Sequence, residues 1–482
     1  MSAVGTDSAI SNHHEGNDNS GILGRTINKS KVYPLEESAH SDICNDYANE
    51  KVSAVEIEEA RKDDQTVSKQ QNSLPRRNLT KAIIFTASII AIALTSIAVV
   101  KFLVPIHSPP ELVYINMIWR HGDRAPIHYF PKFTDKYMIA FPNGIENLTK
   151  NGAKQSEELG MILRRRYIHP KNITPEQIYI RSTNVNRTIE TAQNVLKGMS
   201  YPNIKINTDL ATSVDSAGNP LFDCPVARQY VKDQRIHYMQ RENFSEIYEL
   251  MERELNYSKD PYLLFDTLNC LREHDLVLPE WMKGEELYEK LKYLSWSGLQ
   301  AHLGMEPYSN ELQRKMRGGS TLRGVVSRIA CKVNYSEWKA VDSCNERFYG
   351  LSAHDMTIAS ILSTFSDIDS ILGKSPLIGF GAYIAFEIWK NDNLYEMKVL
   401  YANQWDENPR DITKFAPGCG NSAKFCNVNK FIKQSRPLFF DDIQKECFKD
   451  IDILASSVVK RSVGRNDNDD DDDDIVGRIE MY

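Results

Sequence analysis

The chain has 482 residues, of which 41% are hydrophobic and 26% charged, so it can form one large domain or two ordinary ones with additional segments. Its formal net charge of -7 matches the seven carboxylates of Asp467 and the run from Asp469 to Asp474, which leaves the remainder close to neutral. Nucleic-acid binding needs a concentrated basic surface, so we predict no nucleic-acid partner.

Residues 1–80 are rich in Ser, Asn, Asp, Glu and Lys and contain few aromatic residues. Such a segment cannot bury enough apolar surface to offset the entropy cost of ordering the chain. We predict a disordered cytoplasmic tail here. The aspartate-rich residues 451–482 at the other end predict a second disordered, acidic tail.

An uncharged apolar run from Ala82 to Val100 is long enough to cross a bilayer, and it predicts a transmembrane signal-anchor over residues 81–104. A cleavable signal peptide is the alternative, but about 80 residues precede this run, far more than such peptides carry. Arg76, Arg77 and Lys81 lie before the run, and only Lys101 lies immediately after it. The positive-inside rule therefore predicts a single-pass type II membrane protein whose larger part is lumenal or extracellular.

The cysteines agree with this orientation, because seven of the eight lie beyond the anchor and only Cys44 lies before it. Disulfides form in oxidising compartments, so the larger part is expected to contain them. The same part carries six Asn-X-Ser/Thr motifs, which predict N-glycosylation wherever the asparagine is exposed. These asparagines are Asn147, Asn172, Asn186, Asn243, Asn256 and Asn334.

Residues 105–450 are predicted to form one α/β domain with a mixed, mostly parallel sheet flanked by helices. Its first half reads as strand, helix, strand, helix, a pattern typical of parallel pairing. A polar, helical stretch over about 223–323 predicts an inserted helical cap. Strand character then returns, so the sheet is expected to combine both halves of the chain. The predicted strands are 112–119, 177–181, 347–353, 383–389 and 394–401, and the predicted helices are 149–167, 187–197 and 356–364.

The first motif that suggests chemistry is Arg120-His121-Gly122-Asp123-Arg124-Ala125-Pro126, which follows the first strand directly. Open α/β sheets bind ligands at the carboxyl ends of their strands. Guanidinium groups suit phosphoryl oxygens, and a neutral imidazole nitrogen can attack phosphorus. Gly122 allows a close backbone approach. The alternative for an Arg-His-Gly triplet alone is a surface loop without chemistry.

This motif resembles the active-site signature of the histidine acid phosphatase family, of the prostatic and lysosomal type. Leu148-Thr149, Gly152 and Leu159-Gly160 resemble the helix that follows it there. The segment from Ile180 to Thr188 resembles the family's second motif, with Asn184 and Asn186 where the family commonly has Asp. The resemblance implies that Arg181 is the third phosphate-binding arginine after Arg120 and Arg124. Arg187 is assigned to a structural ion pair outside the catalytic group.

Leu351 to Thr357 resembles the His-Asp motif that completes the family's site. The resemblance implies that His121 is the nucleophile, that His354 helps to bind phosphate, and that Asp355 is the proton donor. For Asp355 an alternative is a helix N-cap, since Asp often accepts hydrogen bonds from free amides there. His274 and Asp275 lie in the predicted cap, where a structural or substrate-shaping role is expected.

The resemblance spans about Leu112 to Cys447 and implies a phosphoglycerate mutase-like fold. It also implies disulfides between Cys224 and Cys447 and between Cys419 and Cys426. Tyr383 stands where the family has the partner of Cys270. Cys331 and Cys344 can pair locally and leave Cys270 free, or one of them can pair with Cys270, and the sequence leaves both options open.

The predicted function is hydrolysis of phosphomonoesters through a phosphohistidine, without cofactor or metal and at the acidic pH that the resemblance implies. A homodimer and a lysosomal, secretory-pathway or cell-surface location are expected on the same basis. A phytase or inositol polyphosphate phosphatase is the near alternative, and a strongly basic pocket from the cap would favour it. A catalytically silent surface binding protein is the alternative from another class. A sugar-phosphate mutase would lack both the anchor and the cysteines.

Overall fold

The computed structural model describes residues 81, 83–93, 95, 109–241, 244–338, 344–373, 377–420 and 424–449. Contacts divide the chain into two units, residues 1–102 and 103–482. The described residues of the first unit are helical, with exposed apolar side chains such as Ile83 and Phe85. Among the described residues, no helix combines the length and the apolar character needed to span a bilayer. Both predicted tails and part of the predicted span, 81–104, lie outside the described residues.

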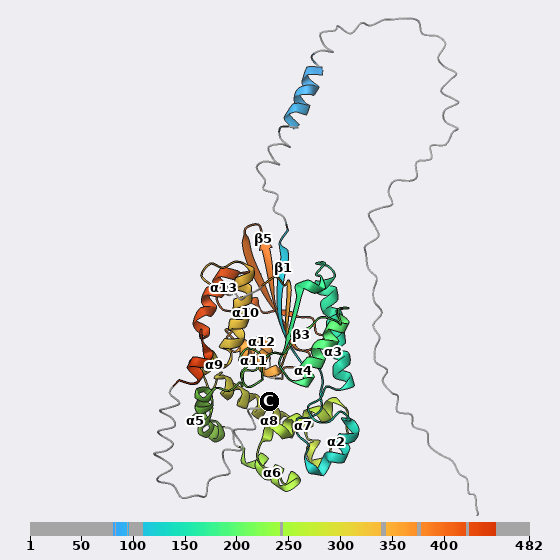
Figure 1. The fold of residues 1–482 in the computed structure, drawn as a ribbon, viewed down its shortest axis with the longest axis vertical. Helices are drawn as coiled ribbons and strands as arrows, with labels where there is room; N and C mark the ends of the chain where they lie inside the picture. Colours follow the sequence, from blue (N-terminus) through green and yellow to red (C-terminus); the bar gives the residue numbers. More distant parts are fainter. Residues whose placement is uncertain are drawn as a thin grey trace, which may run out of the picture. The chain divides into compact units, whose positions relative to one another are not determined.

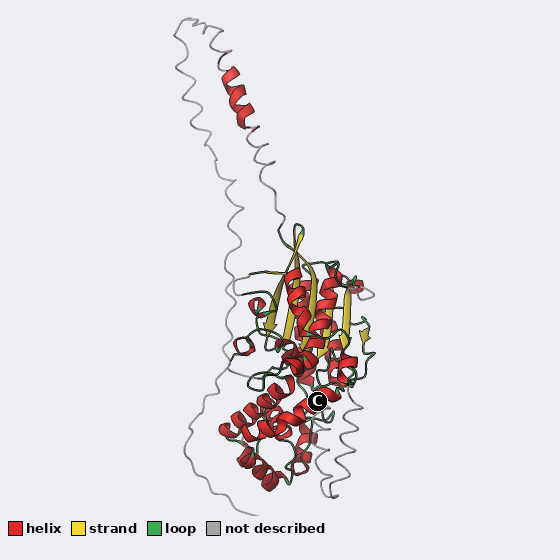
Figure 2. Ribbon diagram, turned by 90° about the vertical axis from the view of Figure 1, so that its left-hand side faces the viewer, coloured by secondary structure: helices red, strands yellow, loops and turns green. Residues whose placement is uncertain are grey.

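The second unit contains an eight-stranded mixed sheet, flanked by helices (Figures 1 and 2). Its order is β3-β2-β4-β1-β5-β6-β7, with β8 also paired to β6. The strands are β1 (Glu111–Arg120), β2 (Ile178–Ser182), β3 (Ile206–Asn207), β4 (Phe348–Ala353), β5 (Tyr383–Asn391), β6 (Leu394–Ala402), β7 (Arg410–Asp411) and β8 (Cys426–Asn427). As predicted, the sheet combines both halves of the chain, because β1 pairs with β4 and β5 from the second half.

The prediction that the sheet is mostly parallel is wrong. Among the described strands, β1, β2, β3 and β4 pair in parallel, whereas β5, β6, β7 and β8 pair antiparallel. The antiparallel pairing of β5 with β6 follows from their short connection, where Asn391 pairs with Leu394 across a two-residue turn. Asp392 in this turn has φ 52°, the left-handed region that two-residue hairpins require.

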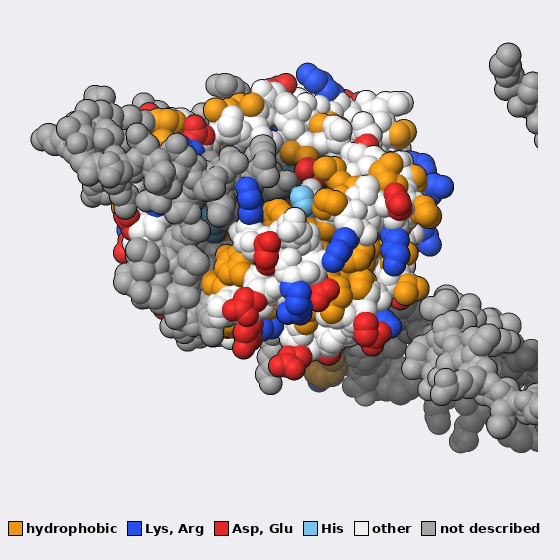
Figure 3. Space-filling model, turned by 90° about the horizontal axis from the view of Figure 1, so that it is seen from below, with side chains coloured by type: hydrophobic (Ala, Val, Ile, Leu, Met, Phe, Trp, Pro, Cys, Tyr) orange, Lys and Arg blue, Asp and Glu red, His pale blue; other side chains and the backbone are white. Residues whose placement is uncertain are grey.

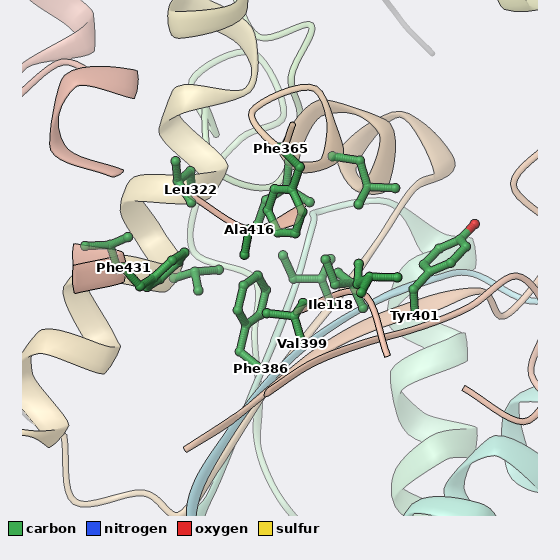
Figure 4. Packing of buried hydrophobic residues seen from close by; sticks show 14 of the residues in the cluster. Ile118, Leu322, Phe365, Phe386, Val399, Tyr401, Ala416 and Phe431 are labelled. Carbon is green, nitrogen blue, oxygen red and sulfur yellow. The ribbon is translucent and has the colours of Figure 1, made fainter. Parts of the chain in front are cut away.

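Both faces of the sheet are buried, which explains why β1 is almost continuously apolar. Side chains alternate along β1: Tyr114 and Ile118 contact one buried cluster, and Ile115 and Trp119 the other. The first cluster includes helices α10, α11 and α13, and Figure 4 shows Leu322 and Phe431 from this layer near Ile118. The second includes α3 and α4. The bounds are α3 (Lys150–Leu163), α4 (Asn186–Gly198), α10 (Gly319–Lys332), α11 (Asp355–Leu362), α12 (Ile368–Leu372), α13 (Val428–Ser435) and α14 (Ile443–Cys447).

A layer of helices lies at the end of the sheet where β1 finishes (Figure 1). It contains α5 (Pro225–Arg241), α6 (Ser245–Leu255), α7 (Pro261–Glu273), α8 (Glu285–Leu303) and α9 (Glu311–Arg317). The predicted cap, 223–323, also included the start of α10, but Leu322 and the following turns of α10 pack on the sheet. Conversely, α2 (Thr134–Ala140) precedes the predicted cap and shares a buried cluster with α6, α7 and α8.

Three disulfides connect six of the seven described cysteines of the second unit. Cys224–Cys447 and Cys419–Cys426 are the two pairs that the resemblance implied. Cys331 pairs with Cys344, so the local option among the two alternatives is the one present. Cys270 is a free, buried thiol.

Candidate active site

The carboxyl ends of the parallel strands bring three distant segments together. Arg120 is the last residue of β1 and pairs with Ala353, the last residue of β4. Ser182, at the end of β2, pairs with Ser352. The loops that begin at His121, Thr183 and His354 therefore start side by side at one edge of the sheet. Figure 3, which looks onto the molecule from the side of the cap, shows a histidine side chain beside hydrophobic ones, with acidic and basic side chains nearby.

His121 is almost fully buried, with 2% of its surface exposed. Its Nδ1 lies 2.8 Å from the carbonyl oxygen of Gly122. A carbonyl only accepts, so Nδ1 carries the proton and Nε2 keeps its lone pair. Burial, followed by the charges of Arg187, Arg120 and Arg124, holds the pKa of His121 well below its ordinary value. The lowered pKa favours the neutral imidazole, in which Nε2 carries a lone pair.

The guanidinium of Arg120 is fixed from three sides. Its Nη1 donates to the carbonyl of Ile378 at 2.5 Å, and its Nη2 lies 3.0 Å from Oδ2 of Asp355. Its Cζ lies 4.3 Å from the ring centroid of Phe380, a cation–π contact. Nε of Arg120 is buried and has no protein partner among the described residues. This arrangement orients a positive group beside His121 before any ligand binds.

Arg124 is held by the cap. Both oxygens of Asp266 on α7 accept from it, at 2.7 Å and 3.2 Å, which is a bidentate pair. Asp266 also accepts from the backbone N–H of Ile127 at 2.9 Å, so one carboxylate fixes both the side chain and its loop. Burial is the largest single influence and lowers the pKa of Arg124, but the charge and hydrogen bond of Asp266, together with Cys270 and Tyr262, raise the pKa well above its ordinary value.

The third arginine near His121 is Arg187, the residue that the sequence analysis left outside the catalytic group. It stands in the first turn of α4 and is 4% exposed. The charge of Arg187 lowers the pKa of both His121 and His354. Burial and the charge of Arg124 in turn lower the pKa of Arg187. Its Nη1 donates to Glu146 at 3.0 Å, so it also makes the ion pair that was predicted for it.

Arg181 is not brought into this group. It lies on the face of β2 that carries Tyr179, and it forms an ion pair with the buried Asp215. Burial lowers the pKa of Arg181, while Tyr349 and Asp215 raise it above its ordinary value. Successive side chains of a strand point to opposite faces of the sheet. Arg181 therefore points away from the face of Ser182 and from the residues that follow it. Arg181 is linked to the site only indirectly. Its partner Asp215 accepts from the N–H of Gly218, and the carbonyl of Gly218 accepts from the hydroxyl of Thr357, which lies beside His354.

His354 and Asp355 stand at the start of α11, and His354 is its N-cap residue. The rings of His354 and His121 have their centroids 5.7 Å apart. Nε2 of His354 lies 3.0 Å from the hydroxyl of Thr183. Burial, followed by the charge of Arg187, lowers the pKa of His354 to about 3, so this histidine is neutral in the free site.

The N-cap alternative for Asp355 is wrong, because His354 is the N-cap residue of α11 and Asp355 is the first residue of the helix. Its Oδ1 accepts from the N–H of Met356 at 2.7 Å in the first turn of α11, and its Oδ2 pairs with Arg120. Burial raises the pKa of this carboxyl, but Arg120, Arg124 and His354 together bring it below its ordinary value. Asp355 is more accessible than Arg120, its partner in the ion pair: 28% of its side chain is exposed, against 8% for Arg120.

Two glycines allow the signature loop to lie against α3. A Cβ on Gly122 would stand 2.4 Å from the carbonyl oxygen of Gly152, and a Cβ on Gly152 would stand 2.0 Å from that of Asp123. Both contacts are far shorter than real Cβ atoms allow, so only glycine fits at either position. This confirms the close approach predicted for Gly122. Among the described residues, no group of three or more His, Cys, Asp or Glu side chains is arranged to hold a metal ion.

The chain is similar in sequence to several known acid phosphatases. Prostatic acid phosphatase of Bos taurus is 24% identical over 360 residues, covering 70% of this chain and 88% of that protein. Lysosomal acid phosphatase of Xenopus laevis is 25% identical over 372 residues, covering 71% and 80%. The phytase of Citrobacter braakii shares the fold, with a TM-score of 0.51, 15% identity and coverage of 69% and 100%. The family model of the histidine phosphatase superfamily (branch 2) matches residues 111–402, more than half of the sequence. The chain therefore belongs to the histidine phosphatase superfamily, in its second branch.

Proposed function

We propose that this chain is an acid phosphatase that hydrolyses phosphomonoesters through a phosphohistidine on His121. The observation that carries the proposal is a buried, neutral imidazole with a free Nε2, in the electrostatic range of three guanidinium groups. A phosphoryl group is an electrophile surrounded by anionic oxygens, so it needs such a combination of nucleophile and positive charge. The acid phosphatases reported above as relatives support the same reaction.

In the first step, Nε2 of His121 attacks phosphorus, and the bond from phosphorus to the ester oxygen breaks. Arg120, Arg124, Arg187 and His354 bind the phosphoryl oxygens, and Asp355 gives its proton to the departing alkoxide. The imidazole becomes positively charged, and the carbonyl of Gly122 at Nδ1 stabilises that charge. In the second step, water attacks phosphorus, Asp355 accepts the proton of the water, and the bond from phosphorus to nitrogen breaks.

The pKa of Asp355 explains why this chemistry suits low pH. In the free site, Arg120 and Arg124 favour the charged carboxylate, which cannot donate a proton. A bound phosphate ester partly neutralises these arginines and raises the pKa of Asp355, and acidic solution raises the protonated fraction further. His121 stays neutral in the same range, because burial and the arginines lower its pKa. Turnover therefore requires a protonated Asp355 beside an unprotonated His121.

The test is hydrolysis of p-nitrophenyl phosphate by the second unit, residues 103–482, from about pH 4 to pH 8. We expect the highest kcat/KM on the acidic side and no loss in the presence of a chelator. Phytate is assayed in parallel, since a strong preference for it would support the phytase alternative. A folded, disulfide-bonded sample without turnover on either substrate would refute the proposal and favour a binding protein.

Arg187→Ala and Arg181→Ala separate the two candidates for the third arginine. Arg187→Ala should lower kcat/KM for p-nitrophenyl phosphate by about 10²-fold and weaken inhibition by inorganic phosphate, because it removes positive charge next to the phosphoryl group. Arg181→Ala should mainly lower stability, by about 3 kcal/mol, because it leaves Asp215 buried without its partner. Steady-state kinetics and urea unfolding measure the two effects. Equal losses of phosphate affinity in both variants would contradict the assignment.

The compartment and the anchor remain proposals from the sequence. Three disulfides support an oxidising environment for the second unit. Four of the asparagines in glycosylation motifs are exposed: Asn172, Asn186, Asn256 and Asn334, whereas Asn147 is partly buried and Asn243 lies outside the described residues. Alkaline carbonate extraction of the full chain tests the anchor at 81–104, because release into the supernatant would exclude it. The homodimer also stays a prediction.

A further inference from the structure

One face of helix α7 contacts the signature loop through three residues. Asp266, Cys270 and His274 are spaced four residues apart on α7 and at its C-cap, so their side chains lie in one row. Asp266 binds the guanidinium of Arg124 with both oxygens, and Sγ of Cys270 lies 3.8 Å from Nη1 of the same arginine. Nε2 of His274 lies 2.7 Å from Oδ2 of Asp123.

From this row of contacts we infer that His274 is a positioning residue, which holds Asp123 and with it the phosphate-binding loop more firmly in acidic solution than in neutral solution. Asp123 stands between the nucleophile and Arg124, and 3% of its surface is exposed. A shift of the Asp123 side chain would therefore displace both His121 and Arg124. The inference rests on the proposed function, because it concerns the same phosphate site.

The link between His274 and Asp123 is well supported by neighbouring groups. The hydroxyl of Thr149, the N-cap residue of α3, donates to the same Oδ2 of Asp123, so the loop, α3 and the cap meet at this carboxylate. The ring of Phe141, which follows α2, packs edge-on against His274 with centroids 4.8 Å apart. The side chain of His274 is 15% exposed, so water competes little for its hydrogen bond.

The charges around His274 favour its protonated form. The hydrogen bond to Asp123 raises the pKa of His274 and outweighs burial, which lowers it, and Glu273 and Asp275 on its own segment add to the increase. Asp123 is the charged group that faces it from the loop, and Phe141 and Thr149 from the other elements are uncharged. A raised pKa in the folded state means that the stabilisation is complete below the ordinary pKa of histidine and disappears as the pH rises through the folded value. The protonated imidazole makes a charge-assisted bond, and the neutral one a weaker bond.

The experiment compares the parent second unit with His274→Asn, which retains a neutral donor, and with His169→Asn as a matched control on an exposed histidine. Binding of inorganic phosphate is measured by calorimetry at about pH 5 and about pH 8, on either side of the ordinary histidine pKa. We expect His274→Asn to bind phosphate about tenfold more weakly than the parent at the lower pH and within about twofold at the higher pH. His169→Asn should match the parent at both.

Two results would overturn the inference. One is a ratio of parent to His274→Asn affinity that is the same at both pH values, which indicates packing alone. The other is an NMR titration of His274 in the parent at or below the ordinary histidine pKa, and this readout does not depend on whether the variant folds. Neither measurement requires turnover, so a protein that binds phosphate without hydrolysing it would refute the proposed function and still test this inference.

Discussion

His121→Ala should abolish the covalent intermediate and lower kcat for p-nitrophenyl phosphate by about 10⁴-fold or more, because no other group can replace the attacking nitrogen. His354 is the nearest imidazole, but its Nε2 is engaged with Thr183. The decisive measurement is rapid mixing with a radiolabelled phosphomonoester and quenching in alkali, where phosphohistidine survives.

In this experiment the parent chain should retain label in proportion to enzyme, and His121→Ala should retain none. His169→Ala, on the exposed surface, is the control and should label like the parent. Label that persists in His121→Ala would move the nucleophile to another residue. A parent that turns over without a labelled intermediate would indicate direct attack by water on the ester.

Asp355→Asn should reduce activity by an amount that depends on the leaving group. An alkyl phosphate releases a strongly basic alkoxide, so loss of the proton donor should lower kcat/KM by about 10⁴-fold. p-Nitrophenolate leaves without full protonation, so kcat/KM for p-nitrophenyl phosphate should fall by only about 10²-fold. The substitution keeps the size of the side chain and an acceptor for the N–H of Met356, which separates proton donation from the start of α11.

The comparison requires glycerol phosphate and p-nitrophenyl phosphate to be assayed with the same enzyme samples. Asp369→Asn, an exposed carboxylate on α12, provides the control and should leave both activities unchanged. A similar loss for both substrates would mean that Asp355 acts through Arg120, its partner at 3.0 Å, and not as the acid.

The sequence allowed the chemistry-bearing loops to be predicted because each follows a strongly apolar strand. Strands β1, β4, β5 and β6 lie close to their predicted bounds, and His121, His354 and Asp355 meet at one edge of the sheet. The direction of β5 was not predicted, since a nearly continuous apolar run has the same appearance in parallel and antiparallel strands.

The error at Arg181 had a signal that could have prevented it. Ile178, Ile180 and Ser182 are the buried positions of β2, so the strand period directs Arg181 to the other side. Arg187 lies in the first turn of α4, the helix that leads away from the sheet edge, and helix N-termini are where anionic ligands bind. By contrast, the role of Asp266 depends on how α7 docks on the loop, and no local pattern contains that information.

The position of β1 also has a consequence for how the chain folds. The strand that carries the nucleophile is hydrogen-bonded on one side to β4 and on the other to β5, both formed by much later parts of the chain. Contacts between such distant segments slow folding, because the entropy of closing long loops is lost before the contacts form. During synthesis the apolar strand β1 therefore stays without its partner strands until the ribosome has completed the cap and β4. The enzyme should acquire activity late, in one step, and ribosome-bound chains that end before β5 should be inactive and prone to aggregation.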